Sequence, residues 1–151
     1  MSLSGLSTSD INNILGGVKI FKGTYASDLV PLISKDKRQA FIINTSRADS
    51  PGSHWVGLAV SGGKCRYFDS FGRENLNLDI LNVCQKAGIQ RYQFSTKQIQ
   101  PAYSDKCGFY CIAFVLSFIR GMSYRSFLNI FSDELEKNDN ICLQFINKFY
   151  S

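Results

Sequence analysis

The chain has 151 residues, of which 44% are hydrophobic and 19% are charged. This composition excludes a disordered or fibrous protein, and the length fits one domain spanning residues 1–151. No apolar run is long enough to cross a bilayer, and the first residues lack the basic start and apolar core of a signal peptide. We therefore expect a soluble intracellular protein that does not contact membranes.

The formal net charge is +5, and the basic residues are scattered apart from the run Lys35–Arg38. This excess fits solubility, and it also fits weak, sequence-independent contact with nucleic acid. The five cysteines are an odd number, which disfavours a disulfide framework. Only Cys107 and Cys111 are close together, and the sole histidine is distant in sequence, so no metal site is expected.

Capping residues, turn residues and hydrophobic patterns predict a series of short elements. In chain order these are a helix capped at residues 7–10 and ended by Gly16, a strand at 40–45, a hairpin of 54–60 and 65–70, a helix at 76–87 and a strand at 89–94. Residues 107–120 are apolar on every side, which predicts a buried central helix. Residues 123–150 predict two helices broken near residues 137–140.

These elements predict an α+β fold, in which a small, mainly antiparallel sheet packs around the buried helix. Cys107 stands at the start of that helix. A helix N-terminus carries partial positive charge and lowers the pKa of a thiol. Gly108 would leave room for a substrate backbone. Taken alone, the Cys-Gly pair fits a reactive thiol and a small buried core residue alike.

His54 and Asp69 fall on facing strands of the predicted hairpin. A symmetric turn at Gly62-Gly63 places His54 opposite Phe71, with Asp69 on its diagonal. Diagonal neighbours on one sheet face are roughly 7–8 Å apart, within reach of long side chains. Taken alone, the pattern favours a structural His–Asp pair over a catalytic one. If a cysteine of this chain acts as a nucleophile with an imidazole base, however, only His54 can supply that imidazole.

Gln100 lies seven residues before Cys107, in a loop that contains Pro101. A glutamine amide can donate hydrogen bonds to the oxyanion of a tetrahedral intermediate. A lone loop glutamine is usually exposed and without a role. The interest of Gln100 therefore comes from its spacing to Cys107.

Together these residues resemble a known family, the adenovirus-type maturation cysteine proteases. The resemblance is carried by His54-Trp55, by the run Tyr67-Phe-Asp-Ser-Phe-Gly72, and by Gln100 followed by Cys107-Gly-Phe-Tyr-Cys111. It extends upstream through residues 21–25, 43–45 and 52–54, and covers roughly residues 6–120. It implies a papain-like, adenain-like fold in which Cys107 is the nucleophile, His54 the base, Asp69 its orienter and Gln100 an oxyanion donor.

Two departures from the family pattern bear on function. The adenovirus enzyme has glutamate where this chain has Asp69, whereas the related ubiquitin-like-protein proteases use aspartate. The adenovirus enzyme is also disulfide-linked to an activating viral peptide through a cysteine in the strand before the glutamine. Residues 89–95 contain no cysteine, so a covalent activator is not expected here. The expected source is a virophage, another double-stranded DNA virus or a virus-like transposon.

The leading hypothesis is an endopeptidase that cleaves viral capsid or core precursors, in the virion or the host cell interior. An alternative is a protease that removes ubiquitin-like modifiers, although 151 residues leave little surface to grip a folded modifier. A third is a basic DNA-binding packaging protein with a degenerate site. No cofactor is expected, and stimulation by DNA or a viral peptide stays open.

Overall fold

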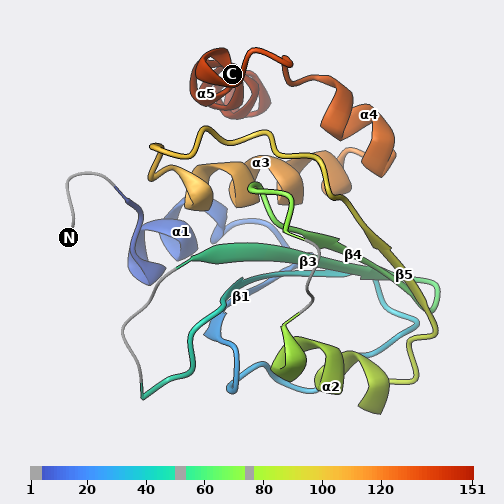
Figure 1. Ribbon diagram of the computed structural model, residues 1–151. Helices are drawn as coiled ribbons and strands as arrows, with labels where there is room; N and C mark the ends of the chain where they lie inside the picture. The colour runs from blue at the N-terminus through green and yellow to red at the C-terminus, as the bar shows by residue number, and fades with distance from the viewer. Residues whose placement is uncertain (1–4, 50–53, 74–76) are drawn as a thin grey trace.

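The computed structural model describes residues 5–49, 54–73 and 77–151, and its centre is a five-stranded sheet in the order β1-β2-β3-β4-β5 (Figure 1). The central strands β2, β3 and β4 are antiparallel, whereas β1 runs parallel to β2 and β5 runs parallel to β4. The strands are β1 (Phe21–Ala26), β2 (Gln39–Asn44), β3 (Trp55–Ser61), β4 (Lys64–Phe68) and β5 (Arg91–Phe94).

Helices cover both faces of this sheet. The long helix α3 lies against one face with α1 and α5, and α2 lies on the opposite side of the sheet (Figure 1). The helices are α1 (Thr8–Leu15), α2 (Leu78–Lys86), α3 (Cys107–Ile119), α4 (Tyr124–Asn129), the 3₁₀ helix η1 (Leu135–Lys137) and α5 (Asn138–Tyr150). None of the helices in the described residues is long and apolar enough to cross a membrane.

Alternating side chains of β2 divide the interior into two clusters. Ala40 and Ile42 face α3, whereas Phe41 and Ile43 face the side that carries α2. This alternation follows from the two-residue period of a strand. Helix α3 is buried along nearly its whole length, as its continuous apolar sequence predicts, and it ends before Gly121 at φ +76°.

The expected α+β fold is confirmed, with several local predictions. Ser7 caps α1 in a capping box with Asp10. The hairpin register pairs Val60 with Cys65, as the symmetric turn predicts. The predicted start of the second helix at Leu76 lies outside the described residues, as do Gly52 and Ser53 of the upstream motif. The expected antiparallel pairing holds for the central strands. Each edge strand instead runs parallel to its neighbour, which the long connections between the paired strands allow.

Two features differ from the expected elements. Strand β1 was not predicted, because it is a half-buried edge strand interrupted at Gly23, where φ is +118° and the register shifts. The predicted break at residues 137–140 is wrong, since α5 already begins at Asn138. The chain breaks earlier because Asn138 binds the backbone of Ser132 through its side-chain oxygen and nitrogen, at 2.7 and 2.9 Å.

Candidate active site

His54 and Asp69 meet at one end of the β3–β4 hairpin. His54 directly precedes β3 and Asp69 directly follows β4, so the paired strands bring both residues to the same edge. The Nε2 atom of His54 lies 2.8 Å from Oδ1 of Asp69, and each side chain is only 5% exposed. The His54 ring also packs on Phe71, with 5.1 Å between ring centroids. These contacts fix the orientation of the imidazole.

The turn after Asp69 holds the carboxylate in place. Oδ1 of Asp69 accepts a 2.8 Å hydrogen bond from the Phe71 N–H, and the Gly72 N–H donates to the Asp69 carbonyl at 2.9 Å. Gly72 has φ +70°, and a Cβ there would lie 2.6 Å from the carbonyl carbon of Lys97. Only glycine tolerates both the conformation and the close approach. The turn is therefore packed against the segment that leads to Gln100.

Cys107 is the first residue of α3 and is partly exposed, whereas the other four cysteines are buried. Burial raises the pKa of its thiol. The hydrogen bond with the His54 ring and those from the backbone N–H groups of Trp55 and Gly108 outweigh burial, so the Cys107 pKa lies below its ordinary value. The thiolate is therefore favoured at this helix start.

The same contacts act in the opposite direction on His54. Burial alone would lower the pKa of His54, but hydrogen bonds and charge interactions with Asp69 and Cys107 raise it to about 9. A lowered thiol pKa beside a raised imidazole pKa favours a thiolate–imidazolium pair near neutral pH. Such a pair holds a nucleophile and a proton donor side by side.

Gln100 has no exposed surface, and two serines fix its amide. Its Oε1 accepts a 2.5 Å hydrogen bond from the Ser70 hydroxyl, while its Nε2 donates to the Ser104 carbonyl at 2.9 Å. Because a carbonyl can only accept, the amide nitrogen must face Ser104. The amide is therefore fully covered in this structure. The geometry fits a loop anchor as well as a covered donor.

Sequence reasoning did not single out Ser70 and Ser104, the two partners of Gln100. The sequence could have indicated Ser70, because it directly follows Asp69 in the Phe-Asp-Ser-Phe-Gly run. No sequence feature indicated Ser104, since nothing local in a polar loop shows that its carbonyl accepts a hydrogen bond from a buried amide.

Trp55 connects this site to the N-terminal segment. Its indole Nε1 donates to the Leu6 carbonyl at 3.1 Å. A Cβ at Gly108 would lie 3.2 Å from the Leu6 Cβ and 3.4 Å from the Trp55 Cδ1. The space beside Gly108 is therefore filled by these two side chains, and the expectation that it admits a substrate backbone is wrong. The missing side chain instead lets the N-terminal segment pack on α3.

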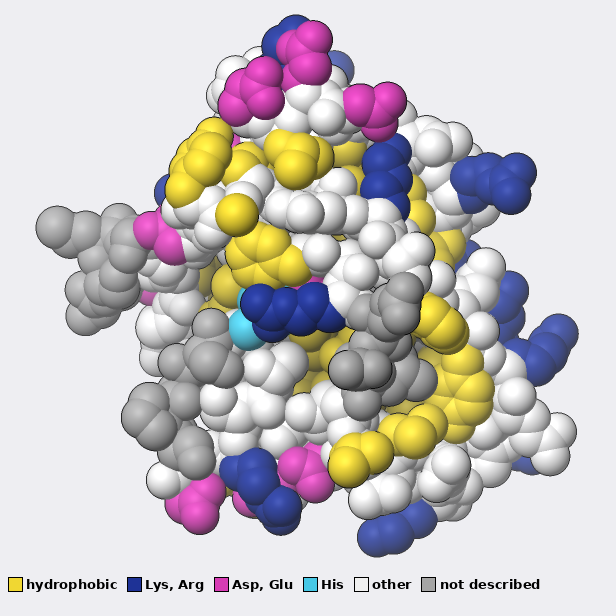
Figure 2. Space-filling model, in the orientation of Figure 1, with side chains coloured by type: hydrophobic (Ala, Val, Ile, Leu, Met, Phe, Trp, Pro, Cys, Tyr) yellow, Lys and Arg dark blue, Asp and Glu magenta, His cyan; other side chains and the backbone are white. Residues whose placement is uncertain are grey.

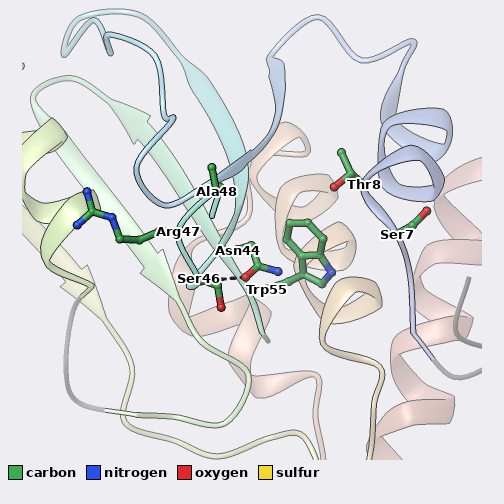
Figure 3. Close-up of a pocket in the computed structure, with 8 residues that line it drawn as sticks. Ser7, Thr8, Asn44, Ser46, Arg47, Ala48 and Trp55 are labelled. Atoms are coloured by element: carbon green, nitrogen blue, oxygen red, sulfur yellow. Dashed lines mark hydrogen bonds between the residues drawn. The ribbon is translucent and has the colours of Figure 1, made fainter. Parts of the chain in front are cut away.

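A polar pocket of about 300 Å³ adjoins Trp55, between the start of α1 and the segment that follows β2 (Figure 3). Ser7 and Thr8 of the α1 start line it on one side, and Asn44 and Ser46 line it on the other. The Arg47 side chain points away from Trp55 (Figure 3), and its guanidinium lies 3.8 Å from Asp28 and 3.9 Å from Asp79. The pocket thus offers hydroxyl and amide groups next to the residue that follows His54.

In Figure 2 the one histidine of the chain, in cyan, is visible at the centre of the face, between hydrophobic side chains and a basic one. The guanidinium carbon of Arg73 lies 5.2 Å from the centroid of the Phe71 ring, which itself packs on His54. Within the described ranges, no cluster of three or more His, Cys, Asp or Glu side chains could hold a metal ion. The site consists of a thiol, an imidazole and a carboxylate.

Comparison with known proteins places the chain in a family. A family model of the adenovirus endoprotease matches residues 21–131. The protease of snake adenovirus serotype 1 is 27% identical, over 75% of this chain and 65% of that protein. The protease of bovine adenovirus 4 is 26% identical, over 91% of this chain and 75% of that protein. The chain therefore spans just under two thirds of the snake adenovirus relative.

A likeness to solved structures supports the fold. The crystal structure of ASFV pS273R protease matches with a TM-score of 0.63 and 13% identity, over 95% of this chain and 66% of that one. A helix that begins at a cysteine and packs on a sheet beside a histidine is the arrangement of the papain-like α+β class. Since the family model covers well over half of the sequence, the chain belongs to the adenovirus endoprotease family.

Proposed function

We propose that residues 1–151 form one cysteine protease domain that cleaves viral capsid or core precursor proteins during virion maturation. The observation that carries this proposal is the position of the His54 imidazole, whose Nε2 lies 2.8 Å from Asp69 and whose pKa is raised by interactions with both Asp69 and Cys107. One imidazole between a carboxylate and a thiol at a helix start is the arrangement that nucleophilic acyl transfer requires. Membership of the adenovirus endoprotease family supports the choice of substrate.

In the proposed reaction the Cys107 thiolate attacks the scissile carbonyl carbon, and His54 gives its proton to the leaving amine. The carbonyl oxygen becomes an oxyanion, for which the Cys107 N–H and the Gln100 amide are the proposed donors. His54 then takes a proton from water, which hydrolyses the thioester and releases the carboxylate product. Asp69 holds the imidazole and stabilises its positive charge.

A peptide library read by mass spectrometry tests the activity directly. The family resemblance implies a narrow cleft that prefers glycine around the scissile bond, so cleavage should concentrate at Gly-containing sequences. Candidate capsid precursors are then digested and their new termini are mapped. Cys107→Ala is the matched control, because it removes one sulfur atom from the site. Equal cleavage by wild type and Cys107→Ala would contradict the proposal, whereas a library without any glycine preference would contradict the narrow cleft.

Removal of ubiquitin-like modifiers remains the second candidate, favoured by the aspartate at position 69. The same assay separates the two functions when a modifier with a C-terminal extension is added beside the capsid precursors. We further propose that the protein acts in the virion and the host cell interior. Its net charge of +5 supports non-specific contact with DNA there.

A further inference from the structure

The contacts behind Gln100 continue to the C-terminal helix α5. The Ser104 hydroxyl, whose carbonyl already binds the Gln100 amide, donates to Oδ1 of Asp139 at 2.9 Å. The Tyr110 hydroxyl of α3 donates to the same oxygen at 2.8 Å. Asp139 lies in the first turn of α5. One carboxylate thus binds both the loop after Gln100 and the helix that begins at Cys107.

The hydrogen-bond directions in this network are determined by chemistry. A carboxylate accepts but does not donate, so the Ser104 hydroxyl hydrogen must point at Asp139. The lone pairs of that hydroxyl then face the N–H of Lys106, at 3.2 Å, and Nε2 of Gln100, at 3.3 Å. Burial and the contact with Asp139 raise the pKa of Tyr110 above its ordinary value, so the phenol also stays a donor. Asp139 therefore fixes the orientation of the Ser104 hydroxyl group.

The residue before Asp139 holds the other end of the same loop. The Asn138 side chain is fully buried, and its Nδ2 donates to the Ile99 carbonyl at 2.8 Å. The start of α5 thus binds the residue before Gln100 through Asn138 and the loop after it through Asp139. Both contacts are long-range, because α5 begins more than thirty positions after Gln100.

We infer that Asp139 is a positioning residue for the proposed protease: through Ser104 it sets the orientation of the Gln100 amide toward the reacting carbonyl. The Ser104 carbonyl takes one amide N–H at 2.9 Å, and the second contact, to the Ser104 hydroxyl, is longer at 3.3 Å. The N–H in the longer contact is the one available to an oxyanion. This inference rests on the proposed function and adds a role for α5.

Steady-state kinetics of Asp139→Ala and Ser104→Ala on a peptide substrate test the inference. We expect kcat to fall on the order of 10-fold in each, with KM within about two-fold of wild type, because the aligned donor acts mainly in the transition state. Asp139→Asn keeps an acceptor oxygen of the same shape and should recover most of the rate. Ser117→Ala is the matched control, since its buried hydroxyl donates to the Phe114 carbonyl within α3 and is not part of the network around Gln100.

Two further readouts separate positioning from loss of structure. The alkylation rate of Cys107 by iodoacetamide should not change in Asp139→Ala, because alkylation develops no oxyanion. The double variant Gln100→Ala/Asp139→Ala should be no more than about two-fold slower than Gln100→Ala alone, since both changes act on one amide.

A wild-type kcat in folded Asp139→Ala would overturn the inference. So would a double variant in which the two rate losses multiply fully. Neither outcome would contradict the proposed protease function. A wild type no faster than Cys107→Ala would overturn the proposed function, and the inference with it. If Asp139→Asn recovers the rate while its melting temperature equals that of Asp139→Ala, the recovery reflects positioning of the amide rather than restored stability.

Discussion

The hydroxyl of Ser70 donates to Oε1 of Gln100 at 2.5 Å, which joins the residue after Asp69 to the proposed oxyanion donor. The backbone repeats this link, because the Gln100 N–H donates to the Ser70 carbonyl at 3.0 Å. The carboxylate that orients the imidazole and the amide proposed to bind the oxyanion are therefore held by one short turn. A change at Gln100 should affect both stability and rate.

We expect Gln100→Ala to lower kcat by about 10², because loss of one oxyanion donor costs roughly 3 kcal/mol in the transition state. It should also lower the unfolding free energy by about 1–3 kcal/mol, since Ser70 and Ser104 lose a buried partner. Kinetics on the folded protein, alongside thermal denaturation, separate the two effects. Normal turnover of folded Gln100→Ala would make the residue a loop anchor only. Gln100→Glu should be no better, because a carboxylate would repel the Ser104 carbonyl and the oxyanion.

Cys107 should be the fastest cysteine to react with iodoacetamide near neutral pH. Its pKa is lowered and its side chain is partly exposed. Burial raises the pKa of Cys111 and of Cys142, and a hydrogen bond with Cys84, together with burial, raises that of Cys65. Cys84 is only 1% exposed. Peptide mapping after brief labelling checks the order, and His54→Ala should slow labelling of Cys107. Faster modification of Cys84 would contradict the assignment.

The pH dependence of kcat/KM should be bell-shaped. The acid limb reports formation of the Cys107 thiolate, whose pKa is lowered, and the alkaline limb reports loss of the His54 proton near pH 9. Asp69→Asn removes the charge that stabilises the imidazolium, so its alkaline limb should move to lower pH and kcat should fall on the order of 10²–10⁴. An unshifted limb would show that Asp69 does not act on His54. His54→Ala should abolish nearly all activity, because the chain has no other imidazole.

Gly72→Ala should destabilise the protein more than Gly62→Ala, although both residues have positive φ, +70° and +57°. A Cβ at Gly62 meets nothing within 4 Å, whereas one at Gly72 would lie 2.6 Å from the Lys97 backbone. The shared strain should cost about 1 kcal/mol in each, and the clash should add to it only at Gly72. Urea denaturation measures both. Equal losses would show that the turn can move away from residues 97–98 without effect.

Local pattern was enough to determine several parts of this protein. The symmetric Gly62-Gly63 turn set the hairpin register, and the register placed His54 and Asp69 at the same end of the strands. Uninterrupted apolar sequence identified α3 as buried, with Cys107 at its start. These features depend on residues close in sequence, or on the fixed period of a strand or helix, so they can be derived without the fold.

Other features depended on contacts between distant segments, and only the tertiary structure decided them. Strand β1 pairs in parallel with β2, and β5 pairs in parallel with β4. Both pairings depend on long connections rather than on turn residues. The start of α5 at Asn138 is set by bonds to Ile99 and Ser132, and the orientation of the Gln100 amide is set by Ser70 and Ser104. A buried polar group takes whichever partner the packed chain brings to it, and nothing in the local sequence specifies that partner.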